Sequence, residues 1–191
     1  MLYLLEVITG PMFSGKSLEL IRRLEIEKLS GKKVNLFRPE LGQHSPNKET
    51  IVNVILIETS ISGIRKIKKR SENLDVVGIQ RAHLFPRFLA EVCDDLANNG
   101  KHVIVSGLNL DFKGEPFETM MELIAKADKI YYLTSVCAVC GNEATRTQRL
   151  IDGLPAHYNS PQIMIGEREL YEPRCRKCHI VIKRKSDLAM E

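Results

Sequence analysis

A stretch near the N-terminus has the residue types and spacing of a phosphate-binding loop, G-x-x-x-x-G-K-[ST]. Its residues are Gly10, Pro11, Met12, Phe13, Ser14, Gly15, Lys16 and Ser17. The glycines let the backbone turn so that successive N–H groups face one anion. In such a loop the lysine reaches the terminal phosphates and the serine hydroxyl binds Mg²⁺. The stretch therefore predicts binding of a nucleotide polyphosphate.

The segments on either side of this loop fit a strand and a helix. Residues 3–8 are mostly apolar, which is typical of a buried strand, and residues 18–29 repeat leucine and isoleucine at near-helical spacing. A helix that begins at the loop would add the positive end of its dipole to the anion site. The alternative is a chance glycine turn that ends in Lys-Ser, and the strand and helix around the motif argue against it.

Two C-x-x-C pairs form the second group of residues that could do chemistry. They are Cys137 with Cys140, and Cys175 with Cys178. Four thiolates can close a tetrahedron around Zn²⁺, and with no open ligand position in view we expect a structural site that holds a small ribbon together. Two separate redox dithiols or buried free cysteines are the alternatives. His179 is a weaker candidate ligand, and Cys93 is interpreted as a core residue.

The elements that must position these groups alternate between strand and helix. Strand-like segments are found at residues 33–37, 51–57, 75–79, 101–107 and 129–133, and helix-like segments at residues 61–72, 88–97 and 118–127. This order predicts an α/β fold with a mostly parallel sheet, helices on both faces, and ligands beyond the carboxyl ends of the strands. The basic run in residues 61–72 is interpreted as a solvated helix face.

These segments also suggest the organisation of the chain. We expect a nucleotide-binding α/β domain over residues 1–134, a zinc-binding domain over residues 135–185, and a tail over residues 186–191. The strand-like residues 33–37 are followed by a loop without apolar rhythm at residues 41–50.

Composition narrows the class of protein. The chain has 191 residues, of which 43% are hydrophobic and 27% charged, as in soluble globular proteins. No apolar run approaches the ~18 residues of a membrane span, and the N-terminus lacks a signal-peptide pattern. An odd number of cysteines, five, fits a reducing compartment, so we expect a cytoplasmic protein with no membrane partner. A net charge of +4 suits anionic small molecules and is too small to indicate nucleic-acid binding.

Further motifs, in the right order, make the chain resemble the type II thymidine kinases over nearly its whole length. Besides the loop at residues 10–17, the similar segments are residues 107–114, 116–117, 144–148, 165–166, 171–172 and 175–179. The resemblance implies an α/β ATP-binding domain and a small zinc-ribbon domain with a lasso loop that closes over the thymidine base. It also implies transfer of the γ-phosphate of ATP to the 5′-hydroxyl of thymidine or a related nucleoside, by a homo-tetramer.

The resemblance implies roles for individual residues. Lys16 and Ser17 take the phosphate and Mg²⁺ roles. The positions that line the thymidine pocket or lie on the lasso are Phe117, Tyr171, Met164, Ile165 and Gly166. For Phe117 and Tyr171, ordinary packing is the alternative.

The chain departs from the family in its acidic residues. Where the family has an Asp-Glu pair after the strand at residues 75–79, this chain has Gln80 and Arg81. In the family the Asp helps to hold hydrated Mg²⁺ and the Glu accepts the proton of the attacking hydroxyl. An arginine stays protonated and cannot be a general base, and loss of such a base slows a reaction by about 10²–10⁴. Because the site becomes more positive, we expect nucleotide binding that depends less on Mg²⁺, together with slow turnover.

Two histidines are candidates for a substitute base. His83 follows Arg81 by two residues and is expected to share a strand face with it, and its ordinary pKa near 6.5 suits the role. His44 lies in the loop at residues 41–50. For each of them a surface histidine without a chemical role is the alternative.

Two functions follow from these patterns. The preferred one is a thymidine kinase with weak or rerouted activity, and the other is a catalytically inactive nucleotide-binding homologue that acts as a sensor or a subunit partner. Nucleic-acid binding through the zinc ribbon and the basic residues 183–185 is disfavoured, because the interleaved aromatic side chains typical of such surfaces are missing.

Overall fold

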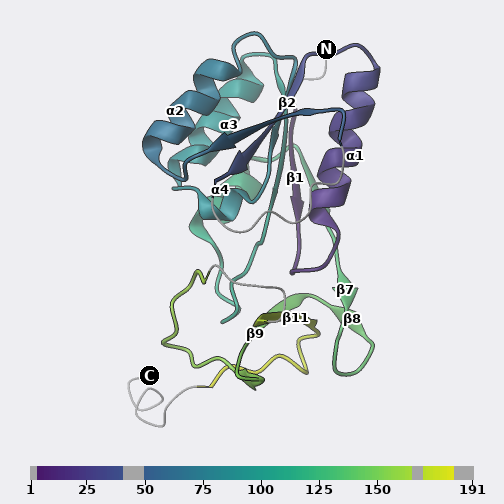
Figure 1. The fold of residues 1–191 in the computed structure, drawn as a ribbon, viewed down its shortest axis with the longest axis vertical. Helices are drawn as coiled ribbons and strands as arrows, with labels where there is room; N and C mark the ends of the chain where they lie inside the picture. The colour runs from purple at the N-terminus through teal and green to yellow at the C-terminus, as the bar shows by residue number, and fades with distance from the viewer. Residues whose placement is uncertain (1–3, 41–49, 165–169, 183–191) are drawn as a thin grey trace.

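A six-stranded parallel sheet forms the core of the protein (Figure 1). The computed structural model describes residues 4–40, 50–164 and 170–182. In chain order the strands are β1 (Leu4–Thr9), β2 (Val34–Pro39), β3 (Asn53–Ile57), β4 (Val76–Ile79), β5 (His102–Gly107) and β6 (Lys129–Tyr132). Their order across the sheet is β3-β2-β4-β5-β1-β6. The prediction of a mostly parallel sheet is confirmed.

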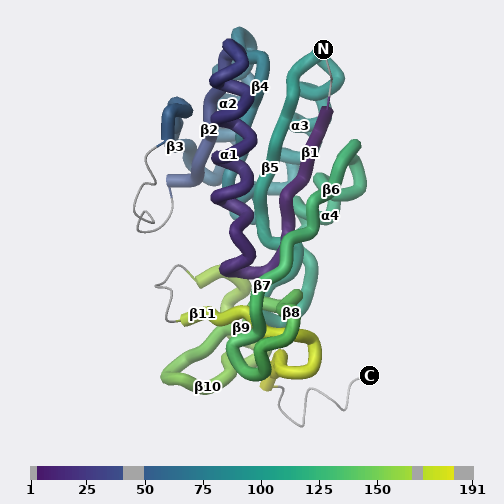
Figure 2. The backbone as a smooth tube through the Cα atoms, turned by 90° about the vertical axis from the view of Figure 1, so that its right-hand side faces the viewer, coloured from purple at the N-terminus to yellow at the C-terminus, as the bar shows by residue number. Residues whose placement is uncertain are grey.

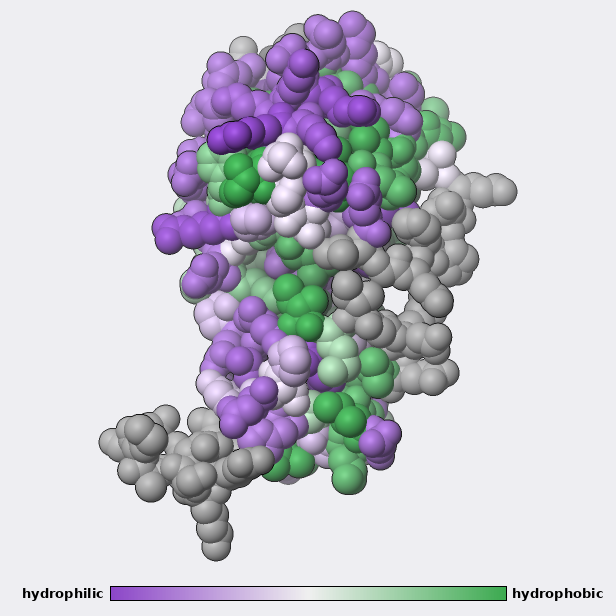
Figure 3. All heavy atoms as spheres, turned by 60° about the vertical axis from the view of Figure 1, so that its left-hand side comes forward, coloured by the Kyte–Doolittle hydropathy of each residue, from purple (hydrophilic) through white to green (hydrophobic). Residues whose placement is uncertain are grey.

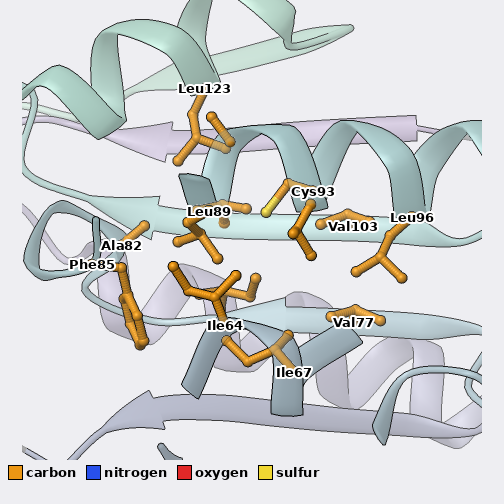
Figure 4. Packing of buried hydrophobic residues seen from close by; sticks show 14 of the residues in the cluster. Ile64, Ile67, Val77, Ala82, Phe85, Leu89, Cys93, Leu96, Val103 and Leu123 are labelled. Atoms are coloured by element: carbon orange, nitrogen blue, oxygen red, sulfur yellow. The ribbon is translucent and has the colours of Figure 1, made fainter. Parts of the chain in front are cut away.

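Helices cover both faces of this sheet, as predicted (Figures 1 and 2). Helix α1 (Lys16–Leu29) lies on one face, and the helices on the other are α2 (Ile61–Arg70), α3 (Phe88–Asn98) and α4 (Glu118–Lys126). Each face has its own hydrophobic cluster. Figure 4 shows the larger one, in which Ile64 of α2, Leu89 and Cys93 of α3 and Leu123 of α4 pack over the strands. Burial of these side chains from water is the main force that holds the layers together.

Helix α2 presents its basic run to solvent. Ile64 and Ile67 are fully buried, whereas the exposed residues of the run are Arg65, Lys66, Lys68, Lys69 and Arg70. The face of the molecule that carries α2 and α3 shows a largely hydrophilic upper surface (Figure 3). Lys66 pairs with Glu58 at 3.2 Å on this surface. The interpretation of the run as a solvated helix face is therefore confirmed.

Short antiparallel strands follow the parallel sheet and lie beyond its carboxyl end (Figure 1). Strands β7 (Ser135–Val136) and β8 (Glu143–Ala144) form a hairpin. A second sheet, in the order β10-β9-β11, consists of β9 (Arg146–Ile151), β10 (Leu154–Pro155) and β11 (Tyr171–Arg174). The division at residue 134 stays a prediction, as does the tail at residues 186–191, which lies outside the described residues.

None of the helices in residues 4–40, 50–164 and 170–182 is both long and apolar enough to span a membrane.

Candidate active site and metal centre

Three segments that follow neighbouring strands lie at the carboxyl edge of the sheet, where the strand order predicts the ligand. Strand β1 pairs with β5 so that Thr9 is opposite Gly107, and β5 pairs with β4 so that Val105 is opposite Ile79. Because these neighbouring strands are parallel, the segments that follow them emerge side by side. The segments are residues 10–17, 80–85 and 107–112.

The conformation of the phosphate loop requires both of its glycines. Gly10 has φ 139°, and a Cβ there would lie 2.0 Å from the carbonyl oxygen of Leu133. Gly15 caps the N-terminus of α1 with φ 82°. Side chains other than hydrogen are strained in this region of φ, so the motif positions are explained by backbone geometry.

Lys16 turns back into the loop that carries it. Its ammonium donates to the hydroxyl of Ser14 at 3.1 Å and also to the carbonyl of Pro11. Burial lowers the pKa of Lys16 to about 7. A polyphosphate beside this ammonium would favour its protonated form, since an opposite charge at close range raises the pKa of a lysine.

Gln80 stands at the position where the family has an aspartate, and its side chain is hydrogen-bonded to an arginine. The side-chain oxygen of Gln80, which is buried, accepts a hydrogen bond of 2.7 Å from Nε of Arg38. Arg38 comes from β2, which pairs with β4 and so places its last residues beside Gln80. Burial lowers the pKa values of Arg38 and Arg81, and the charge of Arg81 lowers that of Arg38 further. Two guanidinium groups therefore lie near each other at this edge.

The sequence did not single out Arg38 as a residue of the site. Its position near the carboxyl end of the strand predicted at residues 33–37 could have indicated it, because ligands lie beyond such ends. What the sequence lacked was the order of the strands, which makes β2 the neighbour of β4.

The backbone turns sharply after Gln80. Arg81 has φ 55°, an uncommon left-handed conformation for a residue with a side chain, and the short 3-10 helix η1 (Ala82–Leu84) follows it. Strand β4 ends at Ile79, so the expectation that His83 shares a strand face with Arg81 is wrong.

His83 is held neutral and hydrogen-bonded. Burial lowers its pKa to about 3, and the charges of Lys16 and Arg81 act in the same direction. Its Nδ1 accepts a hydrogen bond of 3.1 Å from the N–H of Leu108, which assigns the remaining proton to Nε2. Nδ1 is therefore already used as an acceptor, and Nε2 already carries a proton. This geometry gives no support to a role of His83 as general base. His44 lies outside the described residues.

The residues predicted to bind the nucleoside lie in two parts of the structure. Phe117 is buried at the N-terminus of α4, and its ring is 5.0 Å from the ring of His83. The hydroxyl of Tyr171 donates to the carbonyl of Met164 at 3.0 Å. Ile165 and Gly166 lie outside the described residues. The roles of all of these residues in substrate binding stay predictions.

The four cysteines meet as the spacing predicts. The Sγ atoms of Cys137, Cys140, Cys175 and Cys178 lie within 4.8 Å of one another, and those of Cys140 and Cys175 are 3.7 Å apart. Four thiolates bound to Zn²⁺ at about 2.3 Å would be about 3.8 Å apart at the corners of a tetrahedron. The donor set therefore fits a structural zinc ion.

Two other candidates take no part in this cluster. Nε2 of His179 is hydrogen-bonded to the carbonyl of Phe112 at 2.8 Å, which ties that ring to the loop after β5. Cys93 is fully buried in α3, and burial raises the pKa of its thiol, as expected for a core residue.

A parallel sheet with a glycine-rich loop between β1 and α1 defines a P-loop nucleotide-binding protein. A solved structure with a similar fold is the flagellar accessory protein FlaH from Methanocaldococcus jannaschii, with a TM-score of 0.52 and 12% sequence identity. The similarity covers 74% of this chain and 75% of that one. At this identity the likeness concerns the fold alone.

Sequence comparison then identifies the family. A family model described as thymidine kinase matches residues 3–179. The thymidine kinase of Thermococcus kodakarensis is 46% identical over 185 residues, which cover 93% of this chain and 94% of the relative. The thymidine kinase of Pyrobaculum aerophilum is 43% identical over 184 residues, covering 93% and 99%. The chain belongs to the thymidine kinase family, as the resemblance in its motifs indicated.

Proposed function

We propose that this protein is a thymidine kinase-type phosphotransferase that passes the γ-phosphate of ATP to the 5′-hydroxyl of thymidine, with slow turnover. The observation that carries the proposal is the phosphate loop, in which the positive φ angles of Gly10 and Gly15 and the ammonium of Lys16, at the end of β1, suit an anion. Relatives that are called thymidine kinases, and that match this chain over nearly their full length, support the same substrates.

The charge of the site supports binding of ATP more than its turnover. Lys16, Arg38 and Arg81 are cations at the carboxyl edge of the sheet, and a polyphosphate gains from each of them. Ser17 still offers a hydroxyl to Mg²⁺, but the oxygen of Gln80 already accepts a hydrogen bond from Arg38, so the donor set fits Mg²⁺ poorly. We therefore infer that ATP binds with little dependence on Mg²⁺.

A catalytically inactive nucleotide-binding homologue is the second candidate, and one observation favours it. Lys16 and Arg81, the charged residues that act on His83, are both positive and disfavour its protonation. Neither the protonated Arg81 nor the hydrogen-bonded His83 is therefore suited to accept the proton of the attacking hydroxyl. In that case the protein would bind the same ligands without passing on the phosphate.

Two measurements on the purified chain separate these functions. Thymidine-dependent formation of ADP reports turnover, and equilibrium dialysis of ATP in Mg²⁺ or in EDTA reports binding. Lys16→Met should abolish both signals, while Lys28→Met, an exposed lysine on the same helix, should change neither. Binding of ATP without ADP formation would select the inactive homologue, and absence of ATP binding in both buffers would contradict both candidates.

A homo-tetramer in the cytoplasm belongs to the same proposal. It rests on the resemblance to the family, and light scattering of the purified chain would check the oligomeric state.

A further inference from the structure

Arg149 is a cation buried inside the zinc-bearing part of the molecule. It lies on β9, is 1% exposed, and is the largest fully buried side chain in the described residues. Removing a charge from water costs several kcal/mol unless dipoles or opposite charges replace the lost hydration. Such a residue needs partners that explain its place.

The partners of Arg149 are oxygen atoms around the start and end of one chain segment. Its Nη1 and Nη2 donate to the carbonyls of Pro161 and Gln162, the latter at 2.8 Å. Its Nε donates to the hydroxyl of Tyr171 at 3.0 Å. The guanidinium carbon also lies 4.0 Å from the centre of the Phe112 ring, in cation–π geometry.

These contacts continue into a second layer of hydrogen bonds. The hydroxyl of Tyr171 in turn donates a hydrogen bond of 3.0 Å to the carbonyl of Met164, so the described segment 161–164 is held at both ends. Gln162 donates to the carboxylate of Asp111 at 3.2 Å. That carboxylate also accepts the N–H groups of Lys113 and Glu115, in the loop that leads from β5 to α4.

We propose that Arg149 is a positioning residue for nucleoside recognition, which sets the geometry of segment 161–164 and Tyr171. The inference rests on the proposed function, because Met164 and Tyr171 are the nucleoside-binding positions implied there. A guanidinium presents its donors in a rigid fork and can hold two carbonyls and a hydroxyl together. A lysine ammonium at the same place offers a single point charge and cannot span all three.

The test compares three variants at β9. Arg149→Met keeps the length and removes the fork, Arg149→Lys keeps the charge, and Arg146→Met is the control on the opposite face of the strand. Affinities for thymidine and for ATP, and the zinc content, are measured on the same samples. Arg149→Met should weaken thymidine binding on the order of 10- to 100-fold, because small displacements of binding groups cost that much. ATP affinity and zinc content should stay within about twofold, and Arg149→Lys should recover only part of the loss.

A milder variant keeps the inference testable if Arg149→Met does not fold. Tyr171→Phe retains the ring and removes the hydroxyl that joins Nε of Arg149 to the carbonyl of Met164. It should weaken thymidine binding about 3- to 10-fold, as expected for one hydrogen bond.

The outcomes separate this inference from the proposed function. Wild-type thymidine affinity in Arg149→Met or in Tyr171→Phe would overturn the positioning role. An equal loss of thymidine, ATP and zinc binding in Arg149→Met would also overturn it, because such a loss indicates a purely structural arginine. A wild-type chain that binds ATP but no thymidine would overturn the proposed substrate itself.

Discussion

The main-chain N–H of Met12 donates a hydrogen bond of 3.0 Å to the hydroxyl of Thr147 on β9. Close by, the hydroxyl of Ser135 donates to the carbonyl of Phe13 at 3.2 Å. The phosphate loop is thereby tied to the part of the chain that carries the cysteine cluster. The shape of the ATP site should depend on the integrity of that second region.

Replacing Thr147 by valine tests the first of these bonds. The variant keeps the size of the buried side chain and leaves the N–H of Met12 without its partner. A lost hydrogen bond is worth about 0.5–1.5 kcal/mol, so ATP affinity should fall about 2- to 10-fold. Equilibrium dialysis measures the change. Thr145→Val is the matched control, because within the described part of the chain the hydrogen bond from Tyr132 to Thr145 uses the main-chain carbonyl and not the side chain.

Removal of the metal should have a larger effect than Thr147→Val. A structural zinc ion supplies folding free energy to the short strands around it, so a strong chelator should release one zinc per chain and expose residues 135–182 to protease. ATP affinity should then drop as well. Cys140→Ser should copy the effect of the chelator, whereas Cys93→Ala, a change in the buried core under α3, should retain full zinc content. Intact ATP binding after complete loss of metal would refute the coupling.

The pKa of Lys16 predicts the pH dependence of ATP binding. Burial lowers this pKa to about 7, so the free protein loses the proton as the pH rises through that value. The bound polyphosphate favours the charged form, and binding above pH 7 must therefore take up a proton. ATP affinity should fall as the pH rises above about 7. Calorimetry at pH 8 in two buffers of different ionisation enthalpy measures the uptake, and a binding enthalpy that is the same in both buffers would contradict this assignment.

The same shift has a consequence for stability with the opposite sign. Between pH 7 and pH 10.5 the unfolded chain holds the Lys16 proton and the folded chain does not. The free energy of unfolding contributed by this residue therefore rises with pH across that window. Denaturant unfolding at pH 7 and pH 9, compared with Lys16→Met, checks the sign.

Restoring the acidic pair tests the proposal that turnover is slow because the pair is missing. The double variant Gln80→Asp/Arg81→Glu should raise the rate of thymidine phosphorylation by about 10²–10⁴ and make ATP binding depend on Mg²⁺. Arg81→Gln removes the positive charge without supplying a base, and it should leave the rate low. If the single and double variants have the same rate as the wild-type chain, another group performs the proton transfer.

The amino-acid sequence determined the features that arise from short patterns. The phosphate loop, the alternation of strands and helices, the solvated face of α2 and the meeting of four cysteines were all predicted, because periodicity and spacing within a few residues encode them. The departure at Gln80 and Arg81 was also visible, since it changes residue types at positions marked by a motif.

Only the tertiary structure decided how the charged groups are arranged. Arg38 meets Gln80 because β2 and β4 are neighbours, and Arg149 meets Pro161 and Tyr171 because the chain folds back on β9. The state of His83 likewise depends on burial and on the N–H of Leu108. Hydrogen bonds and pKa values are set by what lies within a few ångströms in space, and the order of strands in a sheet brings together residues that no local pattern connects.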